Sequence, residues 1–230
     1  VAGIRSLILR LEAMHPAFAF HLTGPVVGGA TFGEATKGDL KTIMPGMAAL
    51  ILLLLILMLR SWGGVMGTLA VVVAATLTAM GISGWAGFIL NPGSAAAPSI
   101  ILTLAIADSV HLVSGVRHAM ARGLEKPAAI AESLRLNLWP IFLTTATTAA
   151  GFLTMNASAS PPFRDLGNIT AIGVDAAFIY SVTLLPALLS MLPLGQKGRT
   201  GIEQKIMATI GAAIVRRRWP LFAAITVVAL

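Results

Sequence analysis

The chain has 230 residues, of which 57% are hydrophobic and only 11% are charged, and its mean hydropathy is +0.87. This composition is too apolar for a soluble domain of this length and indicates an integral membrane protein. The formal net charge is +7, but the basic residues lie beside apolar runs, where they orient membrane segments, so nucleic acid is not expected as a partner. The chain has no cysteine, which excludes disulfides and thiolate metal sites, and we expect no metal and no cofactor.

Residues 1–41 are expected to be the end of an external α+β domain. Apolar residues at helical spacing near the beginning predict an amphipathic helix. His15 and Pro16 interrupt that pattern, an extended stretch follows around Phe18, and Gly24-Pro25 predicts a turn. The apolar positions of the helix are Ile4, Leu7, Ile8 and Leu11.

Five apolar runs are long enough to cross a bilayer, since a crossing helix needs about 20 such residues. They cover residues 42–59, 65–90, 95–116, 136–156 and 166–192. We therefore expect a five-helix transmembrane bundle over residues 42–193, followed by a cytoplasmic linker helix over residues 194–218. A further run opens at Trp219 and is cut off at residue 230, and the chain begins with Val1 rather than methionine. These features predict an internal fragment of a longer protein.

The basic residues predict which side of the membrane each link faces. One set of links collects eleven lysines and arginines, whereas the short links on the other side offer only Arg164. The positive-inside rule makes the first set cytoplasmic and residues 1–41 external. Within that set, residues 117–135 predict a helix lying along the membrane surface. The eleven are Arg60, Arg117, Arg122, Lys126, Arg135, Lys197, Arg199, Lys205, Arg216, Arg217 and Arg218.

Asp108 is the most informative residue because it lies within an apolar run, where an ionised carboxylate is costly and usually functional. His111 follows one helical turn later on the same side of the helix. At 1.5 Å per residue, Asp108 and Asp175 lie roughly 20 Å and 14 Å from the outer ends of two runs with the same direction. Helix packing is thus expected to join the three residues in one polar cluster that loads and releases protons.

Several polar residues are candidates for supporting this proton relay. Ser109 adjoins Asp108, and Thr145 and Thr148 lie one turn apart on another run. Threonine hydroxyls in helices also bond back to the backbone, so a packing role is an open alternative for them. Asp108 can equally be a hydrogen-bonded acid that fixes helix packing, and His111 can donate to a backbone carbonyl. Asp175 can be a second proton site, a partner for a residue elsewhere in the full protein, or an incidental substitution.

Three stretches resemble, in order and spacing, the membrane half of the resistance-nodulation-division (RND) superfamily of exporters. The branch in question contains the mycobacterial large membrane proteins and hopanoid exporters and is related to sterol-sensing domains. Relatives commonly show a glycine-rich approach to an acid that is followed by Asp or Tyr, whereas here Asp108 is followed by Ser109. The stretches are LTGPVVGGATFGEATKGDLKTIMP (residues 22–45), LTTATTAAGFLTMNASASPPFRDLGNITAIGV (residues 143–174) and LLPALLSMLP (residues 184–193).

The resemblance implies an all-α polytopic bundle in a bacterial inner membrane that exports lipids or hydrophobic small molecules using the proton-motive force. It implies protons, the membrane and a second half of the same chain as partners, while both monomers and multimers remain open. A non-transporting, sterol-sensing-like lipid-binding module is an alternative. An intramembrane aspartyl protease using Asp108 and Asp175 is a minor one, since the Gly-x-Gly-Asp signature is absent. The chain also has no phosphate-binding Gly-x-x-x-x-Gly-Lys-Ser/Thr loop, so we expect a proton gradient and not ATP as the energy source. We expect a transporter and not an enzyme.

Overall fold

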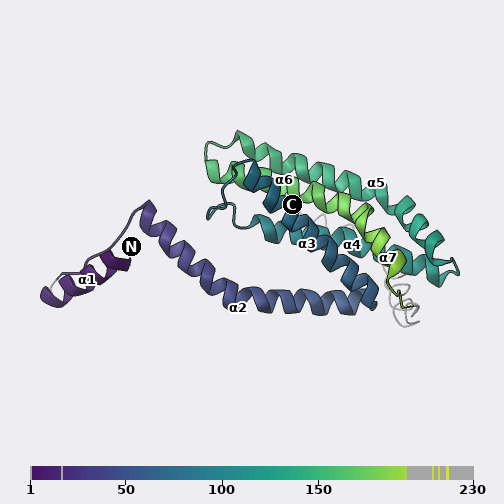
Figure 1. Ribbon diagram of the computed structural model, residues 1–230, viewed down its shortest axis with the longest axis horizontal. Coiled ribbons are helices and arrows are strands. Elements are labelled where there is room, and N and C mark those ends of the chain that lie inside the picture. Colours follow the sequence, from purple (N-terminus) through teal and green to yellow (C-terminus); the bar gives the residue numbers. More distant parts are fainter. Residues whose placement is uncertain (1, 17, 196–208, 210–211, 213–215, 218–230) are drawn as a thin grey trace.

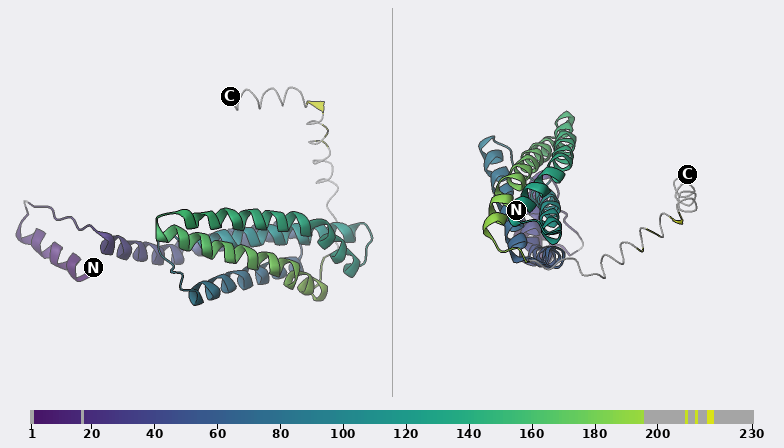
Figure 2. Two further views of the ribbon diagram at one scale, coloured as in Figure 1. Left: turned by 90° about the horizontal axis from the view of Figure 1, so that it is seen from above. Right: turned by 90° about the vertical axis from the view of Figure 1, so that its right-hand side faces the viewer.

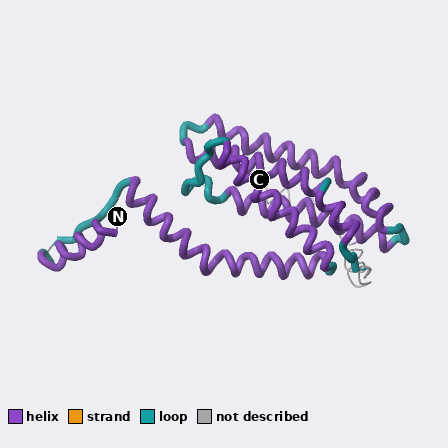
Figure 3. Tube along the Cα trace, viewed as in Figure 1, coloured by secondary structure: helices purple, strands orange, loops and turns teal. Residues whose placement is uncertain are grey.

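The computed structural model describes residues 2–16, 18–195, 209, 212, 216 and 217. Within these residues every regular element is a helix and no strand occurs (Figures 1 and 3). The expectation of an all-α membrane bundle is confirmed. Of the predicted linker helix, only residues 194, 195, 209, 212, 216 and 217 are described, and the run that begins at Trp219 lies outside the described residues. The elements are α1 (Ala2–Met14), α2 (Pro25–Leu59), α3 (Trp62–Trp85), α4 (Ala97–Ala121), α5 (Lys126–Leu153), the 3-10 turn η1 (Thr154–Ala157), α6 (Pro161–Val182) and α7 (Leu184–Met191).

The N-terminal segment contains the predicted amphipathic helix, α1, which is tied to α2. Arg5 Nη1 lies 2.7 Å from a carboxylate oxygen of Glu34, and Arg5 Nη2 donates to the Thr31 hydroxyl at 3.0 Å. The described residues between α1 and α2 carry no regular secondary structure. The described part of this segment therefore contains a helix and no strand.

The first membrane helix is longer than its apolar run suggests. α2 begins at Pro25 and continues without interruption to Leu59, so that its first half projects beyond the bundle (Figure 2). Proline suits the first turn of a helix because its missing N–H needs no partner there. Gly24, whose φ is 122°, turns the chain immediately before it. The helix therefore begins at the predicted Gly24-Pro25 turn and continues through residue 42, where the apolar run starts.

Among the described residues, four helical segments are long and apolar enough to cross a membrane, and Pro45–Leu59 is a shorter apolar helix. In the bundle, α3, α4 and α6 pack against one another, and α5 packs on α4 and α6. Pro186 has no N–H to donate to the carbonyl of Val182, and the helix is interrupted at Thr183, between α6 and α7. The four segments are Trp62–Trp85, Ala97–Ala121, Lys126–Ala157 and Pro161–Met191.

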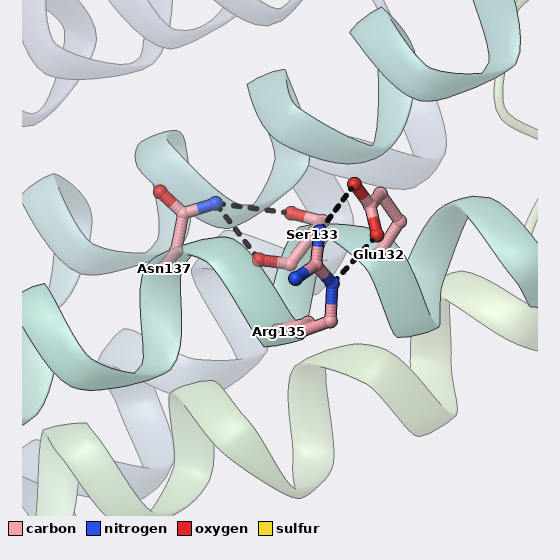
Figure 4. A network of polar contacts seen from close by, with 4 residues as sticks. All are labelled: Glu132, Ser133, Arg135 and Asn137. Carbon is pink, nitrogen blue, oxygen red and sulfur yellow. Dashed lines mark hydrogen bonds and ion pairs between the residues drawn. The ribbon is translucent and has the colours of Figure 1, made fainter.

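The link at residues 117–135 is not the separate surface helix that its charges suggested. α4 continues to Ala121, a short turn contains Gly123 with a φ of 96°, and α5 starts at Lys126. Pro127 stands in the first turn of α5, where proline is tolerated, rather than breaking a helix. Glu132 and Arg135 pair at 2.9 Å on α5 (Figure 4). The charged link is thus made of the ends of two spanning helices and the turn between them.

Two glycines fix how the central helices are aligned. A Cβ placed on Gly64 of α3 would lie 2.7 Å from Cγ1 of Val113 in α4. A Cβ placed on Gly173 of α6 would overlap the Ile101 side chain of α4 and lie 3.1 Å from Ala79 of α3. Glycine allows backbones to approach closely in membrane bundles. These contacts therefore set the alignment of α3 with α4 and of α4 with α6.

Candidate functional site

Asp108 lies at the edge of the buried face of α4. It is half-buried and adjoins a stripe of buried residues that includes Ala105 and Leu112. Among the residues that the structure describes, it has neither a hydrogen-bond partner nor an ion-pair partner. An acid without a partner at this depth of a spanning helix is a candidate for binding a proton.

The direction of Asp108 follows from the helical repeat. It comes seven residues after Ile101, which packs against α6, and this spacing turns it by only about 20° around the axis. Gly115, seven residues further on, lies against Ser133 and Asn137 of α5. Asp108 is therefore directed to the seam between α5 and α6. Because α4 and α5 are antiparallel, it is level with approximately residues 140–144 of α5, close to Thr145.

His111 lies on the exposed side of α4, about 60° around the helix from Asp108. Thr103, Ser114 and His118 share this exposed side. The structure therefore keeps Asp108 and His111 on neighbouring positions of one helix, as their spacing predicted. Their side chains do not form a hydrogen bond with each other or with any other described residue.

Asp175 lies on a different side of the bundle, so the structure does not bring the predicted three-residue cluster together. It is exposed and comes two residues after Gly173, which turns it by about 200° from the contact with Ile101. The predicted difference in depth between the two acids was close, since Asp108 lies about five residues, or ~7.5 Å, further than Asp175 along the shared direction of α4 and α6. The estimate considered depth alone, whereas the close packing at Gly173 decides the direction in which Asp175 points. A dyad of touching carboxyls, which an aspartyl protease needs, is not formed.

The three supporting residues differ in their surroundings. Ser109 is fully buried, Thr145 is nearly so, and Thr148 is half-buried. The neighbouring Thr144 and Thr147 donate to backbone carbonyls of α5 at 2.8 Å, as hydroxyls in helices commonly do. Thr145 is thus the buried hydroxyl of α5 closest in level to Asp108, while Ser109 points about 100° away from that acid.

The sequence reasoning missed several buried polar groups. Ser133 Oγ donates to the Leu112 carbonyl at 2.8 Å and so joins α5 to α4. Within α5, Asn137 donates to the Ser133 carbonyl at 2.8 Å (Figure 4). The sequence pattern that could have indicated these two groups is a Ser and an Asn four residues apart on one helix. The described residues contain no group of three or more His, Cys, Asp or Glu suited to a metal ion. Among the described residues, further buried hydroxyls without a hydrogen-bond partner belong to Thr68, Ser83, Thr170 and Ser181, and to Ser109, which the sequence had already indicated.

Comparisons with known proteins agree with this architecture. The model of the MMPL family matches residues 1–228. The probable transport protein MmpL12 of Mycobacterium tuberculosis is 29% identical over 91% of this chain and 19% of its own length. The putative membrane protein MJ1562 of Methanocaldococcus jannaschii is 28% identical over 64% of this chain and 38% of its own. The hopanoid transporter HpnN of Rhodopseudomonas palustris is 37% identical over 34% of this chain and 9% of its own. The chain thus spans about a fifth of the length of MmpL12.

Proposed function

Because this chain belongs to the MMPL family, a branch of the RND superfamily, we propose that it forms part of a transporter that exports lipids or other hydrophobic molecules from a bacterial inner membrane. The export is driven by the proton-motive force, and Asp108 carries the proton. The observation that carries this proposal is the half-buried position of Asp108 in a spanning helix, without a partner among the described residues.

The physical argument rests on the cost of charge inside a membrane. A carboxylate is expensive at this depth, and binding a proton removes its charge. A proton that crosses with the membrane potential releases about 2.3 kcal/mol per 100 mV. If the two protonation states of Asp108 favour different helix arrangements, this energy shifts the population from one arrangement to the other.

The cargo and the membrane are inferred from two further features. HpnN, which is similar to part of this chain, is described as a hopanoid transporter, and a hydrophobic cargo of this class suits a bundle embedded in lipid. The lysines and arginines at the ends of α4 and α5 favour a cytoplasmic position for the turn between them. This orientation places the first half of α2 outside, where it can transmit helix movements to an external domain.

The test is export by the full-length protein in vesicles with an imposed pH gradient. Asp108→Asn keeps the shape and hydrogen bonding of the side chain but cannot cycle a proton, so gradient-driven export is expected to stop while membrane insertion is unchanged. Asp175→Asn is the matched comparison, because it makes the same change in an acid that points elsewhere. Normal export by Asp108→Asn at every pH would exclude the proposed role. Normal cargo binding by the native protein without gradient-dependent export would favour a lipid-binding module.

A further inference from the structure

Arg117 of α4 is bonded to the end of α2. Its guanidinium donates through Nη1 to the carbonyl oxygen of Leu59, the last residue of α2. The last carbonyls of a helix have no partner within that helix, and a cation beside them also interacts favourably with the helix dipole. Arg117 is half-buried and Leu59 is fully buried. Burial strengthens a charge-assisted hydrogen bond of this kind, so it joins the two helices.

The Arg117 side chain leaves α4 on the side opposite Asp108. Arg117 follows Asp108 by nine residues, which places it ~13.5 Å further along the helix and about 180° around its axis. Val113, one turn before Arg117, packs against Gly64 of α3. Asp108 is directed instead to the seam between α5 and α6. Thus α4 lies between the candidate proton site on one side and the end of α2 on the other.

The other contacts between α2 and the bundle lie near the same end of the helix. Of its described side chains, only Leu55 and Leu59 are buried. Ile51 and Ile56 are partly buried against the core. These four residues belong to about the last three turns of α2. The Arg117–Leu59 bond is therefore part of the attachment by which the bundle holds this helix.

α2 is long enough to enlarge a small movement at its attached end. It continues from Pro25 to Leu59 as one helix, and its first half projects beyond the bundle (Figure 2). Residues 25–50 span ~39 Å at 1.5 Å per residue, so a tilt of about 5° at the attached end displaces Pro25 by ~3.4 Å. A movement of α4 that displaces Leu59 would therefore have its largest effect outside the bundle.

We propose that Arg117 is a positioning residue that couples α2 to the proton site. When protonation of Asp108 moves α4, the Arg117–Leu59 bond passes the movement to α2 and so to the external domain. Asp108 as the driving group rests on the proposed function, whereas the bond is a contact of the structure. The simpler role for a terminal arginine is to anchor a spanning helix at the membrane surface. Arg122 is exposed and suits that role, whereas Arg117 is half-buried and bonded to another helix.

The test uses the full-length protein in vesicles, with spin labels on cysteines that replace Val26 and Ala159. Both positions are exposed, and the distance between the labels reports the tilt of α2 relative to the bundle. An imposed pH gradient should shift this distance in the otherwise native protein. Arg117→Gln should remove the shift and lower gradient-driven export by about fivefold or more. Arg122→Gln, the matched control, removes the same charge from the same end of α4 and should retain both.

Proton binding separates coupling from damage to the proton site. The carboxyl C=O stretching band of protonated Asp108, assigned by its loss in Asp108→Asn, should persist in Arg117→Gln. Loss of that band would make Arg117 part of the proton site and would overturn the coupling role. Arg117→Lys keeps a donor for Leu59 and should retain both the distance shift and export, even if Arg117→Gln does not fold.

Two further results would reject the coupling role. They are a normal distance shift with normal export in Arg117→Gln, and loss of both in a folded Arg117→Lys protein. A failure of the proposed function looks different, because Asp108→Asn would then export normally. Normal export by Arg117→Gln together with an inactive Asp108→Asn would reject the coupling role alone.

Discussion

Ile101 of α4 and Gly173 of α6 occupy the same position in the core, because the Ile101 side chain fills the space that any side chain at residue 173 would need. Ile101 is fully buried, and Gly173 is buried beside Ala79 of α3. This contact brings α4, α6 and α3 together at one level. It also turns Asp175, two residues later, to the opposite side of α6.

The first prediction is that Gly173→Ala destabilises the bundle. The added methyl group meets Ile101 in a closely packed core, where overpacking typically costs about 1–3 kcal/mol. The control is Gly81→Ala in α3, since a Cβ there would meet nothing within 4 Å. Thermal unfolding in detergent should show a lower Tm for Gly173→Ala only. Adding Ile101→Val should restore part of the loss, and a Gly173→Ala protein as stable as the Gly81→Ala protein would refute the contact.

The second prediction concerns Lys126, whose Nζ donates to the carbonyls of Ser190 at 2.7 Å and Leu192 at 2.8 Å. A cation at a helix C-terminus satisfies its free carbonyls and interacts favourably with the helix dipole. Lys126→Met should therefore cost about 1–3 kcal/mol of unfolding free energy. Arg122→Met, which removes an exposed charge from the same turn, should cost much less. Equal losses in the two variants would argue against this capping role.

The third prediction tests the orientation of the bundle. A cysteine replacing Ala159, in the exposed loop before α6, should react with an impermeant thiol reagent added from outside. A cysteine replacing Ala121, exposed at the end of α4, should react only after the membrane is permeabilised. Ser94 is an unsuitable position, although its sequence suggested an outer loop, because it is fully buried and its hydroxyl donates to Ile89 at 2.9 Å. The reverse labelling pattern would invert the topology.

The fourth prediction is that Asp108 and Asp175 are energetically independent. They point to different sides of the bundle, and residues without shared partners usually give additive effects within about 0.3–0.5 kcal/mol. The unfolding free energies of Asp108→Asn, Asp175→Asn and the double variant form the required cycle. A coupling energy well above this range would return Asp175 to the same network as Asp108.

The fifth prediction is that His111 tunes the proton step without replacing it. Its imidazole lies one turn from Asp108 on the exposed edge of α4, so its loss changes the electrostatic surroundings of the acid. His111→Gln should shift the pH at which export is half-maximal more than it lowers the maximal rate. Ser114→Ala, on the same exposed side, is the control. If His111→Gln abolished export at all pH values, the histidine would itself be an essential proton carrier.

The sequence by itself determined the membrane class and the approximate positions of the apolar helices, and it singled out Asp108 as a candidate proton carrier. These properties are local, because they depend on the length of an apolar run, the flanking charges and the cost of an acid inside lipid. The positions of the glycines in the sequence do not show which of them lie at contacts between helices. Gly64 and Gly173 pack against neighbouring helices, whereas Gly81 faces open space.

Only the tertiary structure decided in which direction each side chain points from its helix. A helix of almost uniformly apolar residues has no polar face that would indicate which side is buried. The direction of Asp175 therefore follows from the packing of Gly173 against Ile101. Depth along a helix follows from counting residues, but direction around it follows from the contacts that the helix makes.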